Sequence, residues 1–110
     1  MPAPSVPLQL VYVTVSDKSQ ALTIGKAIVK DRLAACANVI EPMTSLYWWE
    51  GDVQEDTEAV LILKTRKELV PPLTARVKEL HSYDCPCVIS FDIQNGNEAY
   101  MDWLVAETAR

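Results

Sequence analysis

The sequence predicts an α+β fold, a ferredoxin-like βαββαβ sandwich with an extended central β-hairpin and a C-terminal helix. Apolar strand-like segments alternate with amphipathic helical segments in that order, and a further apolar helix follows the fourth strand. The central hairpin is too long for one small domain, because its return limb, residues 53–65, would span roughly 43 Å at about 3.3 Å per residue. A compact chain of this size is only about 34 Å across.

The composition predicts a single domain over residues 1–110. Residues 1–7 hold three prolines and are expected to form a loose N-terminal arm. A net charge of −5 and the lack of a basic stripe argue against nucleic-acid binding. The odd count of 3 cysteines and a start without an apolar signal segment favour a reducing compartment. No apolar run has the 18 or so residues of a membrane span. We therefore expect a cytoplasmic protein.

The first strand and helix are predicted at the start of the chain. Residues 8–15, LQLVYVTV, are almost continuously apolar, as in a strand that is buried on both faces. Ser16 follows as a candidate N-cap, and the helix is expected to continue to about residue 34. Its small and apolar residues fall at i, i+3, i+4 and i+7, on one narrow face that packs on the sheet: Ala21, Ile24, Gly25 and Ile28.

The hairpin follows. Residues 35–40 form a second short strand, which Glu41-Pro42 interrupts. Proline cannot donate a hydrogen bond to a neighbouring strand, so Pro42 marks an edge, bulge or bend. The strand then resumes, and the hairpin turns around Gly51, a residue that readily takes a positive φ. Alternation puts an aromatic side chain on each face of this limb, with Trp48 on one and Trp49 on the other. We expect another copy of the chain to cover them.

In the second half of the chain, hydrophobic periodicity predicts a helix at residues 67–82, a strand at residues 87–93 and a helix at residues 98–108. Pro71 and Pro72 fall in the first turn of the longer helix, where backbone N–H groups have no partner within the helix. The last helix is apolar over more than half its circumference. In this fold two helices cover only one face of the sheet. We therefore expect a neighbouring chain to cover the other face of the sheet and the exposed apolar side of the last helix.

A metal site is one candidate for the function, formed by His81, Cys85 and Cys87. Thiolates and imidazole suit copper and zinc. Cysteines at i and i+2 of an extended chain point to the same side, with Cα atoms roughly 6.5 Å apart. The alternative is that both cysteines are small buried hydrophobic residues and that His81 caps the second helix.

A ligand cleft is a second candidate. Lys64 ends the apolar run AVLILK and shares a strand face with Glu58, and Tyr83 approaches from the loop after the second helix. A lysine in this place binds a carboxylate or another anion, or else simply extends its ammonium to water at the sheet margin. The acidic residues around Asp52 and Glu55 are better explained as a solvated hairpin tip than as a site for hard cations.

The sequence lacks the common catalytic motifs. Its single histidine allows no histidine pair, and it contains no Gly-x-Ser-x-Gly, Walker or Gly-x-Gly-x-x-Gly motif. We therefore expect a binding protein rather than an enzyme.

Four segments resemble a known family: LAACAN at residues 33–38, TSLYWWEG at 44–51, ILKT at 62–65 and HSYDCP at 81–86. In order and spacing they are similar to the CutA family of divalent-cation tolerance proteins, over about residues 10–104. The resemblance implies a ferredoxin-like protomer assembled as a homotrimer, with three sheets facing one another and the hairpins bridging subunits. The expected interface residues are Tyr47, Trp48, Trp49 and Trp103.

The resemblance also implies a role in tolerance to copper and other divalent metals. The metal ligands proposed in bacterial members fall here at Val13, Leu80 and His81, so only His81 keeps a ligand side chain. The trimer implied is similar to that of the PII signalling proteins, and this similarity implies a small-molecule ligand in clefts between subunits as an alternative. A scaffold for a protein partner is the third possibility. Copper or another divalent metal is the only cofactor implied.

Overall fold

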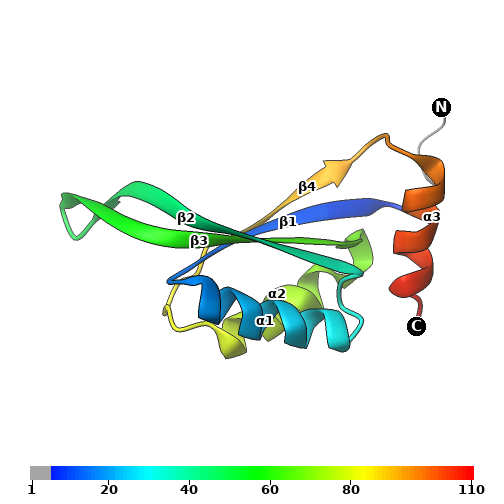
Figure 1. Cartoon of the computed structure of the whole chain (residues 1–110), viewed down its shortest axis with the longest axis horizontal. Helices are drawn as coiled ribbons and strands as arrows, with labels where there is room; N and C mark the ends of the chain where they lie inside the picture. The colour runs from blue at the N-terminus through cyan, green and yellow to red at the C-terminus, as the bar shows by residue number, and fades with distance from the viewer. Residues whose placement is uncertain (1–5) are drawn as a thin grey trace.

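The structure, a computed structural model, describes residues 6–110; residues 1–5 of the expected arm lie outside this part. Four antiparallel strands form one sheet in the order β2-β3-β1-β4, which confirms the ferredoxin-like α+β fold. Figure 1 shows α1 and α2 on one face of the sheet, the β2–β3 hairpin projecting at one end, and α3 at the other. The elements are β1 (Leu8–Val15), α1 (Lys18–Lys30), β2 (Cys36–Trp49), β3 (Asp52–Arg66), the 3₁₀ helix η1 (Lys67–Leu69), α2 (Val70–Leu80), β4 (Val88–Ile93) and α3 (Glu98–Glu107).

The core lies between the sheet and the two long helices. Odd-numbered residues of the inner strands face the helices, so strand alternation fully buries Val13 and Leu61. The four residues of α1 predicted to face the sheet are its buried residues, and α2 adds Leu73 and Val77. A Cβ at Gly25 would lie 3.1 Å from Leu61 Cδ1. The small residue therefore sets how closely α1 approaches β3.

Leucine at position 25 is expected to lower the free energy of unfolding by about 1–3 kcal/mol, because its side chain has to displace Leu61 and Ala37. Urea unfolding at a fixed protein concentration measures the change. Lys26→Leu, at the next and exposed position of α1, is the control and should alter the unfolding free energy by less than about 0.5 kcal/mol. An equal loss of unfolding free energy for leucine at positions 25 and 26 would contradict the close contact between α1 and the sheet.

Both ends of α1 differ from the prediction. The N-cap is Asp17 rather than Ser16, because the Asp17 carboxylate accepts a hydrogen bond of 2.8 Å from a backbone N–H in the first turn. The helix ends at Lys30 rather than near residue 34. Arg32 adopts the left-handed conformation, with φ of 58°, and the backbone closes on the last turn as in a Schellman motif.

The second predicted helix begins with the 3₁₀ turn η1 and ends at Leu80, two residues earlier than expected. Pro71 and Pro72 lie in the first turn of α2, as predicted. His81 has extended backbone angles, φ −79° and ψ 142°, which end the helix. Its N–H still donates to Val77 O at 2.9 Å. The predicted capping position of His81 is thus confirmed for its backbone.

The hairpin is more continuous than predicted. β2 runs through Pro42 without a break, but its register shifts between Ile40 and Met43, so the irregularity predicted at this proline is confirmed while the interruption is not. The turn consists of Glu50 and Gly51, with φ of 50° and 85°, as a two-residue hairpin turn requires. The molecule measures 45 × 27 × 22 Å, and the hairpin extends beyond the helices (Figure 1). The overshoot predicted from strand length is confirmed.

The sheet face opposite α1 and α2 is open. Tyr12 of β1 pairs with Ile62 of β3 and Ile89 of β4, so even-numbered residues of β1 and β3, with Ile89 and Phe91 of β4, share this face. The side chains of Ile89 and Phe91 remain 49% and 54% exposed. Contiguous exposed apolar surface of this kind marks an interaction site in soluble proteins.

α3 closes the end of the sheet away from the hairpin tip (Figure 1). Its buried residues Met101 and Leu104 pack against Leu8. Its other side is only partly covered, since Tyr100 and Trp103 are 40% and 43% exposed. None of the helices in residues 6–110 is long and apolar enough to cross a membrane.

Candidate functional site

A polar cluster lies on the open face at the base of the hairpin. β3 places Glu58 on this face, where it is only 8% exposed. Tyr83, from the loop after α2, donates a hydrogen bond of 2.8 Å from its hydroxyl to Glu58 Oε2. Asp56, the next residue of β3 on the same face, accepts a hydrogen bond from the hydroxyl of Tyr47 on β2. Two phenol–carboxylate pairs therefore border the apolar surface.

His81 holds Tyr83 in place. The two rings are in contact, with centroids 4.7 Å apart. His81 Nδ1 accepts a hydrogen bond of 3.0 Å from the backbone N–H of Tyr83, so this nitrogen carries no proton. The proton is then on Nε2, which donates to Thr14 O at 2.7 Å. Both ring nitrogens are thus bonded: Nε2 joins the loop to β1, and Nδ1 holds the backbone of Tyr83 within the loop.

The residues predicted as metal ligands do not fit a metal ion. His81 has no free lone pair, Cys85 is exposed, and Cys87 is half-buried. Over the described range 6–110, no three His, Cys, Asp or Glu side chains are grouped so that they hold a metal ion. His81, Cys85 and Cys87 are therefore not gathered as a metal site in this protomer, and the histidine has a structural role. The exposed Cys85 is not the buried residue of the alternative interpretation either.

The phenols of the cluster act as donors. Burial raises the pKa of Tyr83, and the hydrogen bond to Glu58 and the charge of that carboxylate raise it further. The hydrogen bond to Asp56 likewise raises the pKa of Tyr47. The arrangement is suited to fixing the shape of a surface, since each carboxylate already accepts a hydrogen bond from a hydroxyl donor.

Tyr83→Phe is expected to reduce the loss of stability at alkaline pH. Since the pKa of Tyr83 is raised in the folded protein, its stabilising effect is complete below the ordinary phenol pKa of about 10 and is lost as pH rises above it. Thermal unfolding between about pH 9 and 12 should show a shallower decline for this variant than for wild type, with the difference appearing above about pH 10. Tyr12→Phe, on the same face but outside this pair, is the control. Equal declines in all three proteins would contradict the assignment.

Lys64, the third residue of the predicted cleft, lies elsewhere. It follows Glu58 by six residues on β3, which places the two roughly 20 Å apart along one face. Its Nζ is 3.3 Å from the hydroxyl of Tyr100 on α3 and 5.4 Å from the centre of that ring. The structure therefore brings Glu58 and Tyr83 together and separates Lys64 from them. Tyr100 was missed because no sequence signal connects α3 with β3.

The four aromatic residues predicted for a subunit interface are all exposed in the protomer. Tyr47 and Trp49 lie on the side of β2 that continues the open face, and they are 39% and 57% exposed. Trp48 lies on the opposite side and is 74% exposed. Trp103 lies on α3, far from the hairpin tip. Their role in assembly stays a prediction.

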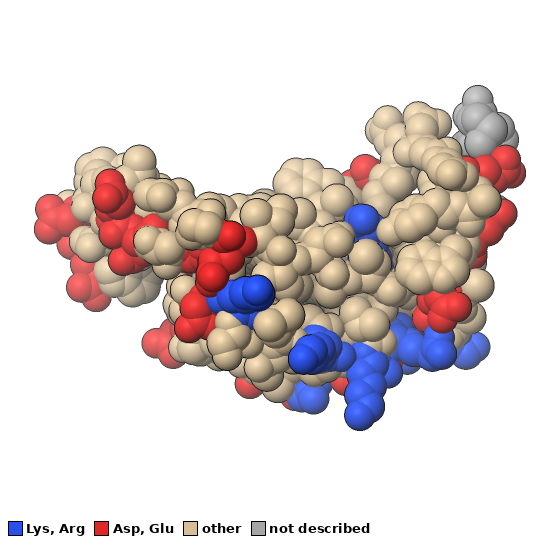
Figure 2. All heavy atoms as spheres, viewed as in Figure 1, with Lys and Arg blue, Asp and Glu red and all other residues tan. Residues whose placement is uncertain are grey.

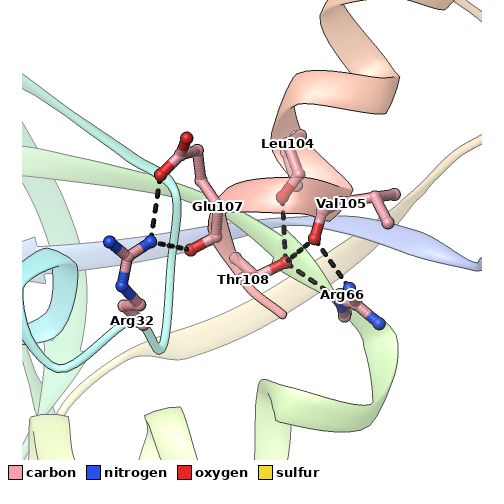
Figure 3. Close-up of polar contacts among 6 residues, drawn as sticks. All are labelled: Arg32, Arg66, Leu104, Val105, Glu107 and Thr108. Carbon is pink, nitrogen blue, oxygen red and sulfur yellow. Dashed lines mark hydrogen bonds and ion pairs between the residues drawn. The ribbon is translucent and has the colours of Figure 1, made fainter. Parts of the chain in front are cut away.

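Two arginines, also missed from the sequence, hold the C-terminal end of α3 (Figure 3). Arg66, at the end of β3, donates to Val105 O at 2.7 Å and to Thr108 Oγ1 at 3.0 Å. Arg32, in the loop after α1, donates to the backbone and side-chain oxygens of Glu107 at 3.1 and 3.0 Å. These guanidinium groups donate to carbonyls in the last turn of the helix, where backbone oxygens lack full pairing and a cation offsets the helix dipole.

Comparison with known proteins places the chain among divalent-cation tolerance proteins. The family model described as CutA1 divalent ion tolerance protein matches residues 9–107. The divalent-cation tolerance protein CutA of Pyrococcus horikoshii is 46% identical over 101 residues, which cover 92% of this chain and 98% of that protein. The chloroplastic protein CutA 1 of Oryza sativa is 45% identical over 104 residues, 94% of this chain, but the chain spans only 59% of that relative.

Solved structures share the fold. The crystal structure of CutA1 from Oryza sativa superposes with a TM-score of 0.92 at 45% identity, covering 94% of this chain and 95% of that one. The divalent cation tolerance protein from Thermus thermophilus has a TM-score of 0.90 at 43% identity, with 93% and 99% covered. A protein of Archaeoglobus fulgidus described as periplasmic has a TM-score of 0.90 at 33% identity, with 93% and 99% covered. The chain has the fold of these proteins over nearly its whole length.

Proposed function

Since the chain belongs to the CutA1 divalent ion tolerance protein family, we propose that it is a cytoplasmic homotrimer that acts in tolerance to divalent metals, copper included, by binding rather than by catalysis. The open apolar face is the observation that carries this proposal. Ile89 and Phe91 are half exposed there, and such a surface needs a partner surface to cover it. A closed ring of three protomers lets each sheet cover the next.

The hairpin supports the same assembly. Its tip extends beyond the helices of its own protomer (Figure 1), and Trp48 and Trp49 are 74% and 57% exposed near that tip. Large aromatic residues supply much of the binding energy of interfaces when they are buried by a partner. The Tyr83–Glu58 hydrogen bond ties the base of the hairpin to the loop after α2, and the Tyr47–Asp56 hydrogen bond joins its two limbs, which supports a hairpin held in one direction.

The cytoplasmic location is supported by the cysteines. Cys36, Cys85 and Cys87 are free thiols, as in proteins of reducing compartments. In this function His81 is not a metal ligand, because both of its ring nitrogens are already bonded.

Two measurements test assembly and metal tolerance separately. Light scattering at low micromolar concentration is expected to give about three times the 12.3 kDa mass of one chain, and a stable monomer would overturn the trimer. Expression in a host without its own member of this family is expected to raise the copper concentration that stops growth. An unchanged copper limit, with the protein present and assembled, would overturn the metal function alone.

A second candidate is a PII-like role, in which a small molecule binds between subunits near Glu58 and Tyr83. The nearly buried Glu58 carboxylate beside the open face is the observation that favours it. A thermal-shift screen with nucleotides and metabolites is expected to find a compound that stabilises wild type and has a smaller effect on Glu58→Gln. Equal shifts for the two proteins, or none, would count against this role.

A further inference from the structure

A groove on the helical side of the molecule lies apart from the open face. It runs between α1 and the edge strand β2, is also lined by Trp103 of α3, and has a volume of about 500 Å³. Sites for small organic molecules usually measure about 300–1,000 Å³. Its remaining walls are largely apolar and include Leu22, Gly25, Val29, Ala37 and Val39.

Two lysines of α1, Lys26 and Lys30, also line this groove. They are four residues apart and so lie on the same side of the helix. The ion pairs found within residues 6–110 all use arginines, so neither ammonium group is paired with a carboxylate. Lys30 lies in the last turn, where a cation offsets the helix dipole, but Lys26 lies one turn earlier and lacks that role.

The positive charge here contrasts with the rest of the protein. The chain has a net charge of −5. Figure 2 shows many acidic side chains over the projecting hairpin and several basic ones below the sheet, on the side of the helices. An apolar groove bordered by two unpaired ammonium groups in an acidic protein is complementary to a ligand with one anionic end and an apolar body.

We propose that this groove binds a small organic anion, whose charged group lies between Lys26 and Lys30 and whose flat apolar body lies against Trp103. The indole is 43% exposed, which leaves ring surface for such a contact. Trp103 is also one of the four residues predicted for the subunit interface, so the proposal requires its indole to stay accessible in the assembly. The contacts proposed for Ile89 and Phe91 on the open face lie on the other side of the sheet and do not depend on this site. Its failure would therefore leave the proposed assembly untouched.

2-Naphthoate is the test probe, because it joins a flat apolar body to one carboxylate, and 2-naphthamide has the same body without the charge. ¹⁵N-labelled protein in its native assembly is titrated with each probe, and amide and indole chemical shifts are followed. Naphthoate is expected to shift signals of α1, of residues 35–39 and of the Trp103 indole. It should bind about tenfold more tightly than the amide, the effect of one charge-assisted contact.

Variants separate the charge from the apolar surface. Lys26→Gln is expected to weaken naphthoate binding at least about fivefold and to leave naphthamide binding unchanged. Trp103→Ala should weaken both probes, and Trp103→Leu replaces it if the alanine variant loses its dispersed spectrum. Lys78→Gln is the matched control, since Lys78 is an exposed lysine near the end of the other long helix, and it should change neither affinity.

Three results would overturn the proposal. The first is a set of shifts centred on the open face around Phe91. The second is equal affinity for the two probes, or full naphthoate binding by the folded Lys26→Gln protein. The third is the absence of any saturable shift at probe concentrations up to about 5 mM.

Discussion

Phe91→Glu is expected to convert the assembled protein into monomers of 12.3 kDa. Phe91 lies on β4 within the open face and is 54% exposed in the protomer, so the substitution has little effect on the protomer's own core. In the proposed trimer this position would be covered by apolar surface, and a carboxylate buried there without a partner would cost several kcal/mol in each copy. Light scattering measures the mass, and far-UV circular dichroism shows that the fold is retained.

Ser90→Glu is the matched control for Phe91→Glu. Ser90 is the preceding residue of the same strand and pairs with Val11, so it lies on the side of the sheet that the helices occupy. It is also exposed and receives the same charge. A trimer that survives Phe91→Glu, or one that Ser90→Glu dissociates equally well, would show that the open face is not the contact between subunits.

His81→Leu is expected to lower the free energy of unfolding by about 2–6 kcal/mol, because it leaves both Thr14 O and the Tyr83 N–H without partners, at about 1–3 kcal/mol each. The affinity for Cu(II) and Zn(II) should not change, since neither ring nitrogen is available to a metal in the folded protein. Urea unfolding and calorimetric metal titration measure the two effects.

His81→Gln provides the control, because an amide has one acceptor and one donor and restores part of the lost stability. The opposite pattern would assign the histidine to metal binding: a leucine variant as stable as wild type whose metal affinity is lost. Such a result would also require the loop around Tyr83 to open when the metal binds.

The elements that local signals determine were predicted well from the sequence. The buried face of α1 follows from periodicity alone, and the hairpin turn follows from a glycine between two apolar limbs. The end of α1 was not predictable in this way. Arg32 occupies a left-handed position where glycine is usual, and its side chain bonds to Glu107, which is 75 residues away in the sequence.

The candidate site was predicted only in part, for similar reasons. Alternation along β3 correctly put Glu58 and Lys64 on one face, but it carries no information about which side chains meet across that face, and the two are separated along the strand. The spacing of His81, Cys85 and Cys87 likewise says nothing about hydrogen bonds already made by the imidazole. Lys64 contacts Tyr100, and the imidazole of His81 bonds to Thr14 and Tyr83. These contacts exist only in the folded chain, so the sequence alone could not reveal them.

The central position of β1 has a consequence for how the protein is made. Leu8 pairs with Arg66 on one side and Ile93 on the other, so both neighbours of the first strand are synthesised long after it. The β2–β3 hairpin closes through contacts that are near in sequence. β1, with the sequence LQLVYVTV, remains unpaired until its neighbours are made, and unpaired apolar segments of this kind aggregate. Yield on expression should therefore depend on slow translation, low temperature or chaperones that shield this segment until β4 has left the ribosome.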